Sequence, residues 1–313
     1  MKKELIFSME SPYRDTFRIW GYRFGEGAKT LAIVGSMRGD EIQQQYICSQ
    51  LVRELMQMED KGMLAPDHEI LVIPSANPFS MNIGKRFWAM DNTDINRMFP
   101  GYDLGETTQR IAAGLFEQIK DYEYGIQMAS FYMPGDFIPH IRMVKTGYED
   151  IEGAKLFGMP YICIRKPKPY DTTLLNYNWQ IWNTKAYSVY GGQNNEVDSR
   201  ESRQTISAIM RFMQRKELIL TGRRMHLADY NSTVMYEADL ASVTAPTAGI
   251  FRQLKHAGDG VSQGDVLAEI IDPYEGKVKS RIVSPVDGVI FFVHNKPLAL
   301  QNTPLFKIHN LSF

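Results

Sequence analysis

The stretch Asp91-Asn92-Thr93-Asp94-Ile95-Asn96-Arg97-Met98-Phe99-Pro100-Gly101 says most about the fold of this chain and about its chemistry. It places an Asn-Arg pair shortly before a Pro-Gly turn. A guanidinium group can donate hydrogen bonds to both oxygens of a carboxylate, and a neighbouring amide adds one more donor. The stretch therefore favours recognition of a carboxylate, and the alternative is a polar loop that happens to contain arginine.

Two apolar runs upstream of this stretch predict buried strands. The first, Thr30–Gly35, leads into Ser36-Met37-Arg38-Gly39-Asp40-Glu41 and then a helical segment. The second, Ile70–Pro74, leads into Ser75-Ala76-Asn77-Pro78 and then Gly84-Lys85-Arg86-Phe87. In order and spacing, Leu31–Gly101 resembles the succinylglutamate desuccinylase/aspartoacylase family, whose members are relatives of the zinc carboxypeptidases.

The resemblance implies a zinc site whose ligands are largely replaced in this chain. The family holds zinc with a His and a Glu in the first turn and with a second His after a later strand. Glu41 is retained, but Arg38 stands at the first His and Ala129 at the second. Val189 stands where the family has its general base, a Glu. Because zinc sites use three or four protein donors, we expect the zinc chemistry to be lost and no cofactor to be bound.

The substrate side of the site is retained by the same resemblance. Arg86 matches the arginine that stabilises the oxyanion, and Asn96 and Arg97 match the pair that grips a substrate carboxylate. Arg38 and Glu41 lie three positions apart at the start of a helix, which is close enough for pairing. We expect the Arg38 guanidinium to neutralise Glu41 and to supply positive charge for an anionic ligand. The alternative is an ordinary structural ion pair.

Replacement ligands for a metal are few. Of the six histidines, only His140 lies in a segment expected to approach the site, and a core histidine is the commoner explanation. Cys48 lies within a predicted helix and Cys163 within an apolar run, so both are expected to be buried structural thiols.

Composition excludes several classes of protein. The 313 residues carry 35 basic and 36 acidic side chains, for a net charge of −1, so bulk attraction to nucleic acid or to an anionic membrane is not expected. No window reaches the roughly 20 apolar residues of a membrane span. Two cysteines and a short N-terminal apolar stretch predict a cytoplasmic protein.

Strand-like runs alternate with helical stretches up to about residue 220. The expected helices are Asp40–Met58, Thr107–Asp121 and Ser199–Arg215, and the expected strands are Leu31–Gly35, Glu69–Pro74, Tyr124–Met128, Tyr161–Ile164 and Ala186–Tyr190. This alternation predicts that residues 1–220 form a carboxypeptidase-like α/β/α sandwich around a mixed, largely parallel sheet. Sites in such sheets lie at the carboxyl ends of the strands, where the Arg38 turn and the Arg97 loop can meet.

Residues 221–313 are expected to form a separate all-β domain. Ala245-Pro246-Thr247-Ala248-Gly249-Ile250-Phe251 recurs as Ser284-Pro285-Val286-Asp287-Gly288-Val289-Ile290, and the two prolines are 39 positions apart (285 minus 246). The two halves resemble a biotinyl/lipoyl-type barrel-sandwich. The intervening lysines, Lys277 and Lys279, lack the sequence pattern of a modified lysine, so no prosthetic group is expected.

Three functions remain open. The leading interpretation is a pseudoenzyme with a deacylase fold that binds a small carboxylate ligand such as an N-acyl amino acid, or that acts as the partner subunit of an active paralogue or of a second copy of itself. The second is an active metal-dependent amide hydrolase that uses zinc with non-standard ligands, among them Glu41 and His140. The third is a structural subunit that binds no small molecule.

Overall fold

The computed structural model describes residues 1–194, 196–220 and 231–311. The chain divides into two compact units. The first comprises Met1–Ser130 and Pro139–Val234, and the second comprises Phe131–Ile138 and Met235–Phe313. The predicted domain boundary at residue 220 adjoins residues 221–230, which lie outside the described part of the chain.

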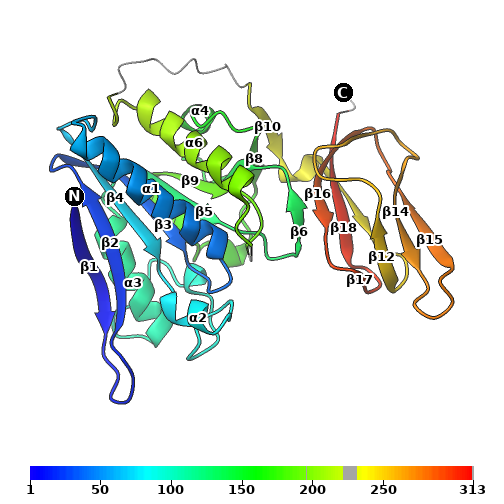
Figure 1. Ribbon diagram of the computed structural model, residues 1–313, viewed down its shortest axis with the longest axis horizontal. Helices are drawn as coiled ribbons and strands as arrows, with labels where there is room; N and C mark the ends of the chain where they lie inside the picture. Colours follow the sequence, from blue (N-terminus) through cyan, green and yellow to red (C-terminus); the bar gives the residue numbers. More distant parts are fainter. Residues whose placement is uncertain (195, 221–230, 312–313) are drawn as a thin grey trace. The chain divides into compact units, whose positions relative to one another are not determined.

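The first unit is built on a mixed sheet of nine strands among the described residues, in the order β1-β2-β4-β3-β5-β9-β7-β8-β10 (Figure 1). Parallel pairing joins β3 to β4 and β5, β5 to β9, and β7 to β8, whereas β1, β2 and the β7–β9 pair are antiparallel. The strands are β1 (Lys2–Met9), β2 (Phe17–Phe24), β3 (Ala28–Ser36), β4 (His68–Ser75), β5 (Tyr124–Ala129), β7 (His140–Val144), β8 (Tyr161–Arg165), β9 (Lys185–Tyr190) and β10 (Thr233–Tyr236).

Helices cover both faces of this sheet, because its central strands are apolar on both sides. On one face α1 (Ile42–Asp60), α4 (Ile151–Lys155) and α6 (Ser199–Arg215) bury a core that includes Ile47, Leu51 and Phe212. Figure 1 shows α1 and α6 lying across this face. On the other face α3 (Thr107–Ile119) and α5 (Leu175–Ile181) bury a second core with Leu115 and Trp179. The predicted sandwich around a largely parallel sheet is confirmed.

Short elements complete the first unit. They are α2 (Pro78–Asn82), η1 (Ile95–Arg97) and η2 (Pro169–Asp171). Both α2 and η1 begin at a side-chain cap: Asn77 accepts a hydrogen bond from the Ser80 amide, and Asp94 accepts one from the Asn96 amide. Such caps satisfy backbone N–H groups that the first turn leaves without partners. They fix the loops that follow β4, which carry the Asn-Arg pair.

The second unit contains two antiparallel sheets that share one core, with Leu267, Phe306 and Ile308 at its centre. One sheet has the order β11-β18-β16-β13, with β6 added beside β16, and the other has the order β15-β14-β12-β17. The elements are β6 (Gly135–Phe137), η3 (Glu237–Asp239), β11 (Leu240–Thr244), β12 (Gly249–Gln253), β13 (Gly260–Val261), β14 (Val266–Ile271), β15 (Val278–Val283), β16 (Gly288–His294), β17 (Leu298–Ala299) and β18 (Pro304–Asn310).

The sequence repeat corresponds to a structural repeat of these strands. β12 begins at Gly249 and β16 at Gly288, which are the glycines of the two Pro-x-x-Gly turns. β12 pairs with β14 and β17, and β16 pairs in the same way with β18 and β13. Each half therefore supplies strands to both sheets, and neither half forms a sheet by itself. Among the described residues, no helix has the length and hydrophobicity that a membrane span requires.

Candidate functional site

The carboxyl ends of β3 and β5 bring the predicted site residues together. β3 ends at Ser36, directly before the turn with Arg38 and Glu41, and β5 ends at Ala129, directly before Ser130. β3 and β5 are parallel neighbours, so these two ends lie at the same edge of the sheet. The candidate site is built from this edge and from the η1 loop.

The carboxylate of Glu41 is fully engaged by protein donors. Its Oε2 accepts hydrogen bonds from the backbone amides of Met37 and Arg38, at 2.9 and 3.1 Å. Its Oε1 accepts from Nη1 of Arg38 at 3.0 Å and from the hydroxyl of Ser130 at 2.5 Å. A carboxylate offers about four acceptor positions, and all four are used here. Glu41 is only 1% exposed, so these protein groups, and not solvent, balance its charge.

Arg38 lies between two carboxylates. Its Nη1 donates to Glu41, while Nε and Nη2 donate to Oδ2 of Asp94 at 3.2 and 2.8 Å. Burial by itself disfavours the charged guanidinium, but the charges of Glu41 and Asp94 raise the pKa of Arg38 above its ordinary value. Arg38 is therefore a buried cation held between two carboxylates.

Arg86 joins the same turn from the loop after α2. Its Nη1 donates to Oδ2 of Asp40 at 2.7 Å, and its backbone carbonyl accepts from the amide of Gly39 at 3.0 Å. Both members of the Arg86–Asp40 ion pair are partly exposed, with side chains 23% and 30% accessible. Arg86 thus lies beside the Arg38–Glu41 turn and keeps access to solvent.

Asn96 and Arg97 follow Asp94 in η1 and differ in exposure. Asn96 is buried, and its Oδ1 accepts a hydrogen bond from the amide of Leu175 at 3.4 Å. Arg97 is 42% exposed at the side chain and lies 5.1 Å over the ring of Tyr170. Its Nη1 donates to the Tyr170 carbonyl at 3.2 Å, and its Nε lies 3.8 Å from Oδ2 of Asp94. Asp94 thus connects Arg97 to Arg38, and Arg97 is the more accessible member of the Asn-Arg pair.

His140 lies at the same edge of the sheet, two strands away from β5. β7 runs antiparallel to β9, and this pairing sets His140 opposite Tyr190 at the carboxyl end of β9. The His140 ring is buried and stacks on the Tyr190 ring with centroids 4.6 Å apart. Arg142 contacts the same Tyr190 ring, with its Cζ 4.4 Å from the centroid.

The residues present at this edge do not fit a zinc ion. Within residues 1–194, 196–220 and 231–311, no group of three or more His, Cys, Asp or Glu side chains is arranged to hold a metal. Ala129 offers no donor atom. Glu41 has its acceptor positions filled by Arg38, Ser130 and two backbone amides.

The position predicted for the general base faces the core. Val189 is fully buried in the core on the α1 and α6 side of the sheet. The parallel register of β5 and β9 instead sets Tyr190 beside Ala129. Since successive side chains of a strand point to opposite faces, Tyr190 points to the other side of the sheet from Val189. Tyr190 is thus the β9 side chain beside Ala129.

Three contributors to the site were not predicted from the sequence: Asp94, Ser130 and Tyr190. Asp94 could have been predicted, because it directly precedes the Ile-Asn-Arg run. A buried arginine at position 38 also requires a second carboxylate. Ser130 directly follows Ala129, but its bond to Glu41 depends on the β3–β5 pairing. Cys48 and Cys163 are buried, as expected, and burial raises the pKa of the Cys48 thiol.

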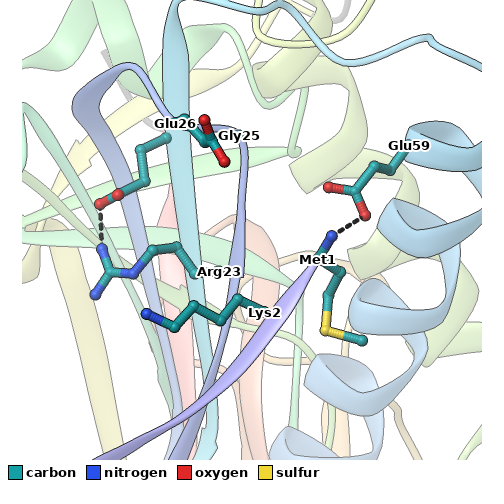
Figure 2. Close-up of a pocket in the computed structure, with 7 residues that line it drawn as sticks. Met1, Lys2, Arg23, Gly25, Glu26 and Glu59 are labelled. Atoms are coloured by element: carbon teal, nitrogen blue, oxygen red, sulfur yellow. Dashed lines mark hydrogen bonds and ion pairs between the residues drawn. The ribbon is translucent and has the colours of Figure 1, made fainter.

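A separate pocket of about 430 Å³ lies at the amino end of β4, away from this site. Figure 2 shows its lining, in which the N-terminal ammonium group points toward the carboxylate of Glu59. Lys2, Arg23 and the N-terminus are matched by Glu26, Glu59 and Glu69. Because its charges cancel, this pocket shows no preference for a charged ligand.

The fold and the site define an α/β protein with a polar, arginine-containing loop cluster at the carboxyl edge of a mixed sheet. Residues 27–133 match the model of the succinylglutamate desuccinylase/aspartoacylase catalytic domain. This match agrees with the resemblance drawn from the sequence, and it spans β3, β4, β5 and the Arg38, Arg86 and Arg97 positions of the candidate site.

Solved structures share the fold over nearly the whole chain. A succinylglutamate desuccinylase/aspartoacylase from Rhodobacter sphaeroides superposes with a TM-score of 0.78 at 18% identity, covering 98% of this chain and 95% of that one. The product-bound ectoine utilization protein EutE of Ruegeria pomeroyi gives a TM-score of 0.78 at 17% identity, covering 98% and 94%. A putative family member from Shewanella frigidimarina gives 0.80 at 16% identity, covering 100% and 98%. No curated protein matches the chain.

Proposed function

We propose that this protein is a pseudoenzyme of the desuccinylase/aspartoacylase family that binds a small carboxylate-bearing molecule, such as an N-acyl amino acid, without a metal. The observation that carries the proposal is the saturation of Glu41 by Arg38, Ser130 and two backbone amides. A metal would have to displace a buried guanidinium and break these bonds. The Arg38 charge takes the place of the Lewis acid electrostatically, but it cannot activate water.

Arg97 is the group proposed to contact the ligand. It is the accessible arginine of the Asn-Arg pair, and it is positioned by Asp94 and by the Tyr170 ring. Arg86 is proposed to contribute a second, partly exposed guanidinium from the loop after α2. Guanidinium groups favour an anion, and their planar shape favours a carboxylate in particular.

The second unit is proposed to be an unmodified barrel-sandwich of the biotinyl/lipoyl type. Its support is the strand exchange between two similar halves. A cytoplasmic location, and a partner that is an active paralogue or a second copy, remain proposals that follow from composition and family.

Calorimetric titration with a panel of N-acyl amino acids tests the proposed function. We expect saturable binding of at least one member, no release of the free carboxylic acid, and at least tenfold weaker binding after Arg97→Ala. Arg53→Ala changes an exposed arginine of α1 and serves as the matched control, with affinity unchanged.

Two results would overturn this proposal. Hydrolysis of the bound amide that is lost on treatment with a chelator would establish the alternative, a metal-dependent hydrolase. Absence of binding across the whole panel would favour a structural subunit.

A further inference from the structure

A second binding site is formed along α6, apart from the candidate site. A groove of about 400 Å³ lies between the outer face of α6 and the segments around Pro139 and Pro160. This volume is within the range of small-molecule sites, which is about 300–1,000 Å³. The α6 side chains that line it are Arg200, Arg203, Gln204, Ser207, Ala208 and Arg211.

The charged residues that line the groove are all basic, and they all lie on α6. The α6 residues recur every three or four positions, so they form a continuous stripe on one face of the helix. Three of them are arginines, and among the described residues none that lines the groove is acidic. Arg200 and Arg203 are exposed, and in the part of the chain that the structure describes neither forms an ion pair with a carboxylate.

Arg200 and Arg203 are like charges three positions apart, and such pairs repel on a helix. Asp198 at the N-cap of α6 and Glu201 in its first turn offset the effect of the helix dipole on Arg200. An anion in the groove would reduce the repulsion between the two arginines.

The opposite wall is apolar and fixed. It consists of Pro139, Gly158, Met159 and Pro160. Arg211 holds this wall to the helix, because its Nε donates to the Phe157 carbonyl at 3.0 Å and its Nη2 to the Gly158 carbonyl at 3.4 Å. A bare inorganic anion would leave this apolar surface unused.

We propose that the α6 groove binds a small organic anion with an apolar body, such as a carboxylic acid that carries an aryl or alkyl chain. The carboxylate contacts Arg200 and Arg203, and the apolar body covers Met159 and the two prolines. Since the groove shares no lining residue with the Arg38–Glu41 turn or η1, this site is independent of the proposed function.

The test uses the full chain and 4-phenylbutyrate as the probe. Calorimetry is expected to give saturable binding, and the uncharged 4-phenylbutanol and inorganic phosphate are each expected to bind at least tenfold more weakly. Arg200→Glu/Arg203→Glu is expected to weaken phenylbutyrate binding at least tenfold. Arg18→Glu/Arg53→Glu changes the net charge equally at exposed positions outside the groove and is expected to have no effect.

Arg97→Ala separates this site from the candidate site, since it should leave phenylbutyrate binding intact. Loss of binding in Arg97→Ala but not in the α6 double variant would overturn the proposal, as would equal loss in the two double variants. No saturable binding at millimolar probe would also overturn it. Thermal melting of each variant shows whether an altered affinity reflects the groove or a damaged fold.

Discussion

Arg38 is the central charge of the candidate site, because it forms ion pairs with two carboxylates. Its guanidinium is shared by Glu41 and Asp94, and all three side chains are buried. A buried charge costs free energy unless it is paired and hydrogen-bonded. The surroundings meet this requirement: Glu41 and Asp94 balance the charge of Arg38, and Ser130 donates a further hydrogen bond to Glu41.

Arg38→Ala should reduce the free energy of unfolding by roughly 3–5 kcal/mol, because it leaves the buried Glu41 without its cation and leaves Asp94 with only the more distant Arg97 guanidinium. Arg86→Ala breaks a partly exposed pair and should cost about 1 kcal/mol or less. Urea denaturation of the two variants measures the difference. Equal small losses in both would mean that the Arg38 ion pairs are not structurally important.

The sequence predicted the Arg38–Glu41 pair but not its second carboxylate. The pair is local, three positions along the chain, so spacing alone indicates it. The Asp94 and Ser130 contacts join residues 56 and 89 positions apart, and they depend on strand order. The functional roles of Arg86, Asn96, Arg97 and His140 stay predictions.

At the scale of elements, the turn between β3 and α1 positions the site. Gly39 lies where this turn meets the loop after α2, and a Cβ there would clash with backbone atoms of Ser80 and Lys85. Backbone atoms cannot move aside as a flexible side chain can. The close approach explains why this turn needs glycine between Arg38 and Asp40.

Gly39→Ala should therefore lower the free energy of unfolding by about 1–3 kcal/mol, as overpacking does, and should displace Arg38 and Arg86 relative to each other. Gly260→Ala is the control, since a Cβ at Gly260 meets open space and should change stability by no more than about 0.5 kcal/mol. Denaturant unfolding of both variants measures the difference in their free energies of unfolding. Similar stabilities would contradict the tight packing of the Gly39 turn.

Elements with strong periodicity were predicted well. The helix expected at Ser199–Arg215 is α6 with the same bounds, and the helix expected at Thr107–Asp121 ends two residues earlier, at Ile119. The antiparallel strand β7 was not predicted, although it brings His140 beside Tyr190. The direction of β7 depends on its pairing with β9. A local sequence pattern does not predict pairing between distant segments.

At the scale of the whole molecule, the second unit contains two buried histidines that link its stability to pH. Burial lowers the pKa of His294 and His309 below the ordinary value of 6.5. Above this pH both rings are neutral in the folded and the unfolded chain. Below it the unfolded chain binds protons that the folded unit does not, so stability falls as the pH decreases.

The unfolding temperature of the second unit should therefore decrease between about pH 7 and pH 5 by an amount that His294→Gln/His309→Gln reduces. His256→Gln, at an exposed position, is the control and should leave the decrease as it is. Scanning calorimetry at a series of pH values measures it. A decrease of the same size in the His294/His309 variant would show that other groups cause the acid destabilisation.

The sequence predicted two parts because its two patterns differ in kind. Alternating strands and helices marked the first part, and the 39-residue repeat marked the second. The exchange of strands between the two β sheets was not predictable, since a repeat gives the number of similar units but not how their strands pair.

The metal content of the purified, tag-free protein after growth in zinc-replete medium tests the proposed loss of the zinc site most directly. With Arg38 bound to Glu41 and no donor at Ala129, zinc and other transition metals should be far below one per chain. Metal near one per chain that is lost in Glu41→Gln would contradict the proposal and would place Glu41 in a working metal centre.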